Sequence, residues 1–302
     1  MSERVKNDKI TQRAVIVLLL GAAAISFAPI FVRLSELGPI ATAFHRVLLA
    51  LPVLWFWMSQ DNKNLGNPEK RHRQPSSLKD FARLGLAGLF FVGDLSFWHW
   101  SIKLTSIANS TLLANFAPIF VTLAGFLLFG ERFSKTFLIG LVFSFAGLLL
   151  LLGDSFVFQT DHLLGDAYGL VAAIFYAAYL MTVSRLRADF STATVMFWSS
   201  LVTCIGLVPV TLISGESFIA QSLFGWAVLV ALALISHAGG QGMIAYALAH
   251  LPAAFGSVGL LLQPALAAII AWFVFGESLS PLQLSGGLVV ILGIYFARRG
   301  TR

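Results

Sequence analysis

Long runs of apolar residues, separated by short polar segments, occupy most of this chain. Ten of these runs approach the ~20 residues that an α-helix needs to cross a bilayer. They cover residues 14–33, 39–58, 81–101, 106–129, 135–152, 165–184, 192–214, 225–246, 254–275 and 280–297. The pattern therefore predicts an all-α integral membrane protein with ten transmembrane helices.

The segment 108–153 occurs twice in the sequence. Shifted by 146 positions and without a gap, it aligns Pro118 with Pro264, Phe129-Gly130-Glu131 with Phe275-Gly276-Glu277, and Gly140 and Gly147 with Gly286 and Gly293. Arg33-Leu34 matches Arg185-Leu186 at an offset of 152, which makes the first apolar run the first helix of the repeated unit. We expect two five-helix repeats, residues 14–152 and 165–297, with short tails at 1–13 and 298–302.

The basic residues predict the orientation of the helices. With the N-terminus in the cytoplasm, seventeen of the twenty lysines and arginines fall on the cytoplasmic side, only Arg33 and Lys103 fall outside, and Arg46 lies within a helix. The positive-inside rule therefore places both termini in the cytoplasm. Because each repeat has an odd number of helices, the second repeat is inverted relative to the first.

The first apolar run also fits, in part, the pattern of a cleaved signal peptide. It follows a basic start and contains Ala22-Ala23-Ala24. The run continues to Val32, however, and belongs to the repeat. We expect the mature protein to keep it.

Composition narrows the classes of function. Apolar residues make up 58% of the chain and charged residues 11%, whereas soluble domains carry roughly a quarter charged residues. The net charge of +6 lies in short runs between apolar segments, which indicates loops beside a membrane and no nucleic-acid partner. No Walker lysine, His-Glu-x-x-His or Gly-x-Ser-x-Gly motif is present, so we expect no catalytic residue, cofactor or metal site.

The clearest charged residues at membrane depth are Arg46 in the second predicted helix and Asp94 in the third. Counted at ~1.5 Å per residue, both lie about 4 Å to the outer side of the midplane. Charges at membrane depth are costly and mark functional sites by default. Two interpretations stay open: a buried ion pair that holds two helices together, or an Asp94 that exchanges a proton or a substrate ammonium for Arg46 during transport.

Other polar and aromatic residues at membrane depth are candidates for the same site. His237 and Gln241 lie four residues apart on one face of the eighth helix, in a glycine-rich run. Trp98 shares a helix face with Asp94, and Tyr176 and Tyr179 lie in the sixth helix. Close helix packing through small residues, or a structural histidine, explains the first pair equally well.

Two prolines interrupt matching helices of the two repeats. Pro118 and Pro264 cannot donate a backbone hydrogen bond, so we expect a kink at each. Asn115 stands three residues before the first proline, and Gln263 directly before the second. The freed carbonyls and the amide side chains suit a polar binding surface, although a kink kept for packing alone remains an alternative.

Taken together, the two five-helix repeats, the Phe-Gly-Glu motif that ends the fourth helix of each, and the Trp100-Ser101-Ile102-Lys103-Leu104 stretch before the first copy resemble the drug/metabolite transporter superfamily, in particular its EamA-type permeases. The resemblance covers residues 14–297. It implies a basket-like fold with a central cavity, alternating access, and amino acids, other metabolites or cofactor-like molecules as substrates. It transfers no binding residue.

The resulting hypothesis is a secondary active transporter that moves a small organic metabolite, amino-acid-like or otherwise polar, across the bacterial inner membrane. The expected partners are the lipid bilayer and a small-molecule substrate, with protons as the leading coupling ion. A second copy of the chain, forming a homodimer, stays open as a further partner. The alternatives are a channel or lipid scramblase of the same fold, and a membrane-embedded enzyme.

Overall fold

The computed structural model describes residues 2–63, 72–152, 160–276 and 279–301, and every regular secondary-structure element in these ranges is a helix. Ten helical segments among these described residues are long and apolar enough to cross a membrane. They are Asp8–Leu34, Pro39–Asn62, Leu78–Leu104, Asn109–Phe129, Lys135–Leu152, Leu163–Asp189, Thr192–Ser214, Leu223–Ala247, Ala253–Phe275 and Pro281–Gly300. The predicted all-α membrane fold is therefore confirmed.

Several spans consist of more than one helix. The elements of the first half are α1 (Ser2–Ile25), α2 (Ala28–Leu34), α3 (Pro39–Leu48), α4 (Leu51–Lys63), α5 (Leu78–Leu104), α6 (Ile107–Ala114), α7 (Ala117–Phe129) and α8 (Lys135–Leu152). After a short 3-10 turn, η2 (Thr160–His162), the second half contains α9 (Leu163–Asp189), α10 (Thr192–Ser214), α11 (Leu223–Ala231), the π-helix η3 (Leu232–Gln241), α12 (Gly242–Ala247), α13 (Ala253–Gly259), α14 (Leu262–Phe275) and α15 (Pro281–Gly300).

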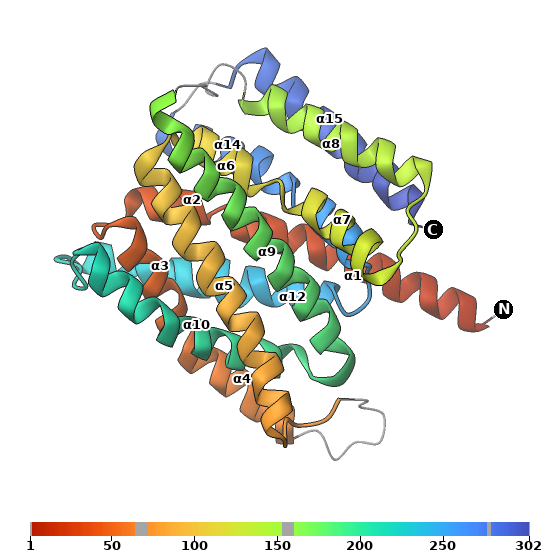
Figure 1. Cartoon of the computed structure of the whole chain (residues 1–302), viewed down its shortest axis with the longest axis horizontal. Coiled ribbons are helices and arrows are strands. Elements are labelled where there is room, and N and C mark those ends of the chain that lie inside the picture. The colour runs from red at the N-terminus through yellow and green to blue at the C-terminus, as the bar shows by residue number, and fades with distance from the viewer. Residues whose placement is uncertain (1, 64–71, 153–159, 277–278, 302) are drawn as a thin grey trace.

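The helices pack as two equivalent halves. Helix α5 of the first half packs against α9 of the second half; the helices equivalent to α5 in the second half, η3 and α12, pack against α1 of the first half. The two fifth spans, α8 and α15, run side by side along one edge of the bundle, and both chain ends lie on the same side of the molecule (Figure 1). This exchange of partners is what two inverted repeats related by an axis in the membrane plane produce.

Glycines explain the close approach of α8 and α15. A Cβ atom on Gly147 would lie 2.5 Å from the backbone nitrogen of Val290, and one on Gly286 would lie 2.5 Å from that of Leu151. A Cβ on Gly140 would lie 2.6 Å from the carbonyl oxygen of Gly293. Small residues let helix backbones approach closely in membranes, where apolar burial alone gives little driving force.

The repeated Phe-Gly-Glu motif ends α7 and α14. Gly130 and Gly276 have φ angles of 65° and 69° and form the left-handed C-caps of the two helices, a conformation that favours glycine. Arg185 lies over the Phe129 ring at 3.4 Å, and its repeat equivalent Arg33 lies over Phe275 at 4.2 Å. The motif therefore fixes matching helix ends at the two faces of the bundle.

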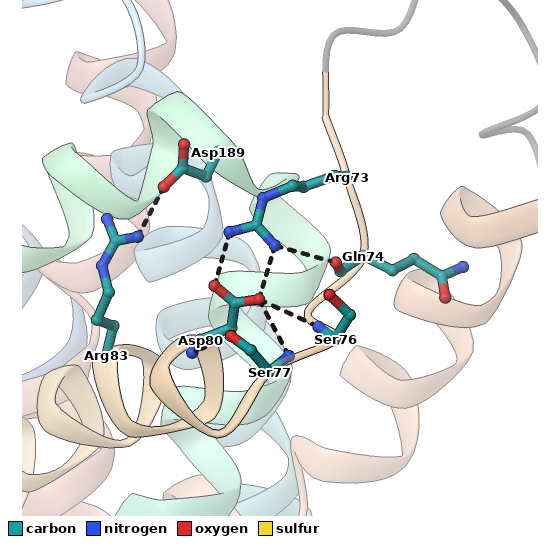
Figure 2. A network of polar contacts seen from close by, with 7 residues as sticks. All are labelled: Arg73, Gln74, Ser76, Ser77, Asp80, Arg83 and Asp189. Carbon is teal, nitrogen blue, oxygen red and sulfur yellow. Dashed lines mark hydrogen bonds and ion pairs between the residues drawn. The ribbon is translucent and has the colours of Figure 1, made fainter.

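On one face of the bundle, polar side chains at helix ends, together with Arg73 of the preceding loop, join the two halves. Arg73 forms a paired contact with Asp80 at 2.6 Å, and its backbone nitrogen donates to the Asp189 carbonyl at 3.0 Å. Arg83 binds the Asp189 carboxylate at 2.8 Å (Figure 2). These contacts fix the start of α5 against the end of α9.

On the opposite face, two carboxylates cap helices of the other half. Glu216 accepts a hydrogen bond from the Ala41 nitrogen at the start of α3 and forms an ion pair with Lys103 at 2.5 Å. Glu36 accepts from the backbone nitrogens of Gln221 and Ser222 and from the Ser222 hydroxyl at the start of α11. Both faces of the bundle are thus joined across the halves by polar contacts.

Candidate functional site

A central cavity of about 150 Å³ lies where the two halves meet. Side chains from α5, α6, α7 and α3 line it from the first half, together with the break between α1 and α2. From the second half, α9, the end of η3, α13 and α14 contribute. The interface between inverted repeats is where transporters of this architecture place their substrates.

Arg46 and Asp94 both line this cavity. Each feels the charge of the other, but among the described residues they form no direct ion pair, and the Nε of Arg46 has no hydrogen-bond partner. Arg46 is 6% exposed. Asp94 is half-buried, so a separated pair of opposite charges faces the cavity, and this arrangement can receive a molecule that carries both an anionic and a cationic group.

Amide side chains from the second half complete the polar lining. Gln241 ends the π-helix, and Gln263 lies in the first turn of α14, directly after the break that precedes Pro264. The Oε1 of Gln241 and the Nε2 of Gln263 are buried without a partner in the described chain. The Tyr176 hydroxyl lies close to both amides. These groups offer a donor and an acceptor to a ligand.

The structure interrupts the fourth and ninth spans directly before the two predicted kinks. Pro118 and Pro264 both line the cavity, and so does Asn115, the residue that caps α6 and donates to the Thr111 carbonyl at 2.8 Å. Because its amide nitrogen already has a partner, Asn115 presents mainly its side-chain oxygen to a ligand. Trp98 also lines the cavity, one turn from Asp94.

Tyr179 and His237 lie one layer behind the cavity wall. Phe91, which lines the cavity, stacks on Tyr179 at 4.7 Å and on His237 at 5.7 Å between ring centres. The Nε2 of His237 is 2.9 Å from the Ser200 hydroxyl. The two residues therefore support the wall instead of facing the cavity, because the glycine-rich π-helix turns Gln241 inward and leaves His237 against α10.

Small hydroxyl residues of the cavity were missed in the sequence. Thr111 and Ser257 line it from α6 and α13, and they are 146 positions apart, so the repeat offset alone pairs them. Ser26 lines it at the break between α1 and α2, where its hydroxyl donates to the Ala22 carbonyl. The signal for this break was Pro29, in the first turn of α2.

Both charged residues that line the cavity, Arg46 and Asp94, come from the first half of the chain. At the repeat offsets, Arg46 corresponds to Trp198 and Asp94 to Gly240. The fold is symmetric, but the cavity is not, so its chemistry has been specialised on a common scaffold. No group of three His, Cys, Asp or Glu side chains that would suit a metal occurs in the described part of the chain.

In the described part of the chain, ten membrane spans in two inverted halves surround a cavity that contains two charged side chains, and this architecture defines a membrane carrier. The EamA-like transporter family matches residues 12–153 and 163–299, which is most of the chain. The protein therefore belongs to the EamA-like transporter family, and it is a transporter and not an enzyme.

Similar proteins agree with this assignment. An uncharacterized transporter of Archaeoglobus fulgidus is 28% identical over 89% of this chain and 91% of its own length. A probable terminal-alkyne amino-acid exporter of Streptantibioticus cattleyicolor is 25% identical over 67% of this chain and 68% of its own. One crystal structure superimposes with a TM-score of 0.75 over 96% of this chain and 98% of that chain, at 18% identity, which shows a shared fold.

Proposed function

We propose that this protein is a secondary active transporter of a small zwitterionic metabolite with amino-acid-like chemistry. The observation that carries the proposal is the separated pair of Arg46 and Asp94 in one buried cavity. Arginine presents a planar fork that matches a carboxylate, and Asp94 offers a carboxylate to an ammonium group. One of the similar proteins is described as a probable terminal-alkyne amino-acid exporter.

Proton coupling is the energy source that the geometry favours. Asp94 is a half-buried carboxylate that lines the cavity, and the opposite charge of Arg46 shares this cavity without forming an ion pair with it in the described chain. Such a carboxylate either binds a proton or binds the substrate ammonium, since an uncompensated charge at membrane depth is costly. Competition between the two would couple the movement of substrate to that of protons.

The proposed orientation follows the distribution of lysine and arginine, with both termini in the cytoplasm of a bacterial inner membrane. We also propose that export is the physiological direction, in keeping with the amino-acid exporter to which the chain is similar. Alternating access itself runs either way according to the gradients.

The experiment is counterflow in proteoliposomes. Vesicles preloaded with one member of a panel of unlabelled amino acids take up the labelled form of the same compound only if the protein exchanges it. Saturable counterflow of zwitterions, absent for their amides and for their decarboxylated amines, would support the proposal. Flux that does not saturate would indicate a channel or scramblase and overturn it.

The control variant for coupling is Asp94→Asn, which keeps the side chain's size and removes its charge. We expect loss of proton-driven transport, while counterflow falls according to how much the ammonium contact contributes. Full and still pH-dependent transport by Asp94→Asn would remove Asp94 from the coupling role.

A further inference from the structure

A second cavity, of about 470 Å³, opens on the outside of the bundle between α5, α7 and α9. Eleven of its thirteen lining residues are apolar; the other two are Thr182 and Arg185. Leu127 and Leu128 at its edge are 64% and 72% exposed. We call it the lateral groove. It lies behind the central cavity, since Phe90 lines the groove while its neighbour Phe91 lines the cavity.

The lateral groove has the length of one bilayer leaflet. Along α7 it runs from Phe120 to Phe129, and the nine steps between these residues rise about 14 Å at ~1.5 Å per residue. Half of a hydrocarbon core of ~30 Å is about 15 Å. A single acyl chain aligned with the helices would therefore extend through the groove without passing into the opposite leaflet.

One end of the lateral groove carries a positively charged side chain, Arg185. The guanidinium of Arg185 lies 3.4 Å above the Phe129 ring, which fixes its position. The side chain is exposed, and within the described chain it donates no hydrogen bond and joins no ion pair. Arg132 and Lys135 follow α7 at the same end. A guanidinium fork with free donors matches a phosphate group.

We propose that the lateral groove is a binding site for an anionic phospholipid, with one acyl chain along α7 and α9 and the phosphate on Arg185. Charge and shape together distinguish this site from the rest of the lipid-facing surface. The apolar lateral groove ends at the guanidinium of Arg185, which is already fixed in position by the Phe129 ring. The site is separate from the proposed substrate cavity and does not depend on the substrate. The lipid would brace α7 and α9, two of the helices that carry the cavity.

The test uses the full chain purified in a neutral detergent and titrated with dioleoyl phosphatidylglycerol or dioleoyl phosphatidylcholine. Native mass spectrometry measures the bound lipid. We expect the anionic lipid to be retained in preference to the neutral one. Arg185→Gln should weaken retention of the anionic lipid about fivefold, as expected for removal of one cation. Arg33→Gln, the repeat equivalent on the other face, is the matched control and should change it little.

Ala178→Phe tests the apolar part of the site, because Ala178 lines the groove away from the charge. The larger ring should reduce retention of the phospholipid while Arg185 is intact.

Inorganic phosphate at equal concentration should displace no lipid; displacement would reveal a plain anion site and overturn the proposal. Equal retention of both lipids by the wild type, or equal retention of the anionic lipid by the wild type and Arg185→Gln, would also overturn it. If Arg185→Gln does not fold, added salt should selectively release the anionic lipid from the wild type.

Discussion

Arg46 is the residue on which substrate selection depends in the proposed function. It is buried in α3 and faces a cavity that holds Asp94 and two amide side chains, Gln241 and Gln263, each with one polar atom that has no partner in the described chain. We predict that Arg46→Gln raises the KM for a zwitterionic substrate roughly 10- to 100-fold, the range expected for loss of a hydrogen bond to a charged group. Arg46→Lys keeps the positive charge but loses the planar guanidinium fork, so its KM should lie between those of the wild type and Arg46→Gln.

Initial rates of counterflow at several substrate concentrations measure this effect. The contradicting result is a lower maximal rate with an unchanged KM in both variants, since that would leave Arg46 a structural role only. Expression and monodispersity of the two variants serve as the folding control.

Glu36 gives a prediction about acid stability. Its pKa is lowered from the ordinary value because the Ser222 hydroxyl and two backbone amides at the start of α11 bind the ionised form. A lowered folded-state pKa means that this contribution is present above the ordinary glutamate pKa of about 4.3 and is lost as the pH falls through the folded-state value.

Thermal unfolding in detergent tests this linkage. At pH 6, Glu36→Gln should unfold at a lower temperature than the wild type. The difference should narrow as the pH falls below about 4, because the wild-type carboxylate then becomes protonated. A gap that stays constant with pH would show that the carboxylate charge does not contribute.

At the scale of single elements, the contact of α8 with α15 is the most constrained by backbone geometry. A Cβ atom on Gly293 would lie 2.7 Å from the Gly140 carbonyl oxygen and would also overlap Ser144. We predict that Gly293→Ala costs roughly 1–3 kcal/mol, the usual cost of overpacking. Gly287→Ala on the same helix is the matched control, because its Cβ would meet Ala265 at 3.8 Å, an ordinary contact. Thermal unfolding compares the two; equal losses of stability would contradict the packing account.

The elements show why the sequence predicted some features and missed others. Hydrophobic runs and a gapless repeat fix the number, order and inversion of the spans, because the bilayer sets their length. Pro118 and Pro264 marked two breaks in the helices. The π-helix at Leu232–Gln241 had no such mark. It changes which side chains face the cavity, so counting in steps of four grouped His237 with Gln241 although only Gln241 lines it.

The charged residues at membrane depth could also be identified from the sequence. Placing a charge in the hydrocarbon core costs free energy, so charged residues are rare in apolar runs and are easily recognised there. Hydroxyl residues such as Ser26 have no such cost, because they donate to a carbonyl of their own helix. The separation of Arg46 from Asp94 depends on how three spans pack, which no local pattern encodes. Sequence therefore located the charged members of the candidate site and left their mutual geometry to the tertiary structure.

At the scale of the whole molecule, inversion of the repeats gives a prediction that one matched pair of residues can test. Thr136 and Leu282 are equivalent at the offset of 146, and both are exposed in the first turn of their helices, α8 and α15. In the proposed orientation Thr136 lies on the cytoplasmic side and Leu282 on the outer side. Cys204, the one native cysteine, is buried in α10 and can be replaced by serine to give a clean background.

In that background, we expect a membrane-impermeant maleimide to label Leu282→Cys in intact cells and Thr136→Cys only after the membrane is opened. The reverse labelling pattern would be consistent with inverted repeats but would mean that the whole protein has the opposite membrane orientation. Arg185 and the lateral groove would then lie in the outer leaflet. Labelling of both sites from the same side would contradict inversion itself. Because the two positions share their place in the helix and their exposure, a difference between them reports on the side of the membrane and not on reactivity.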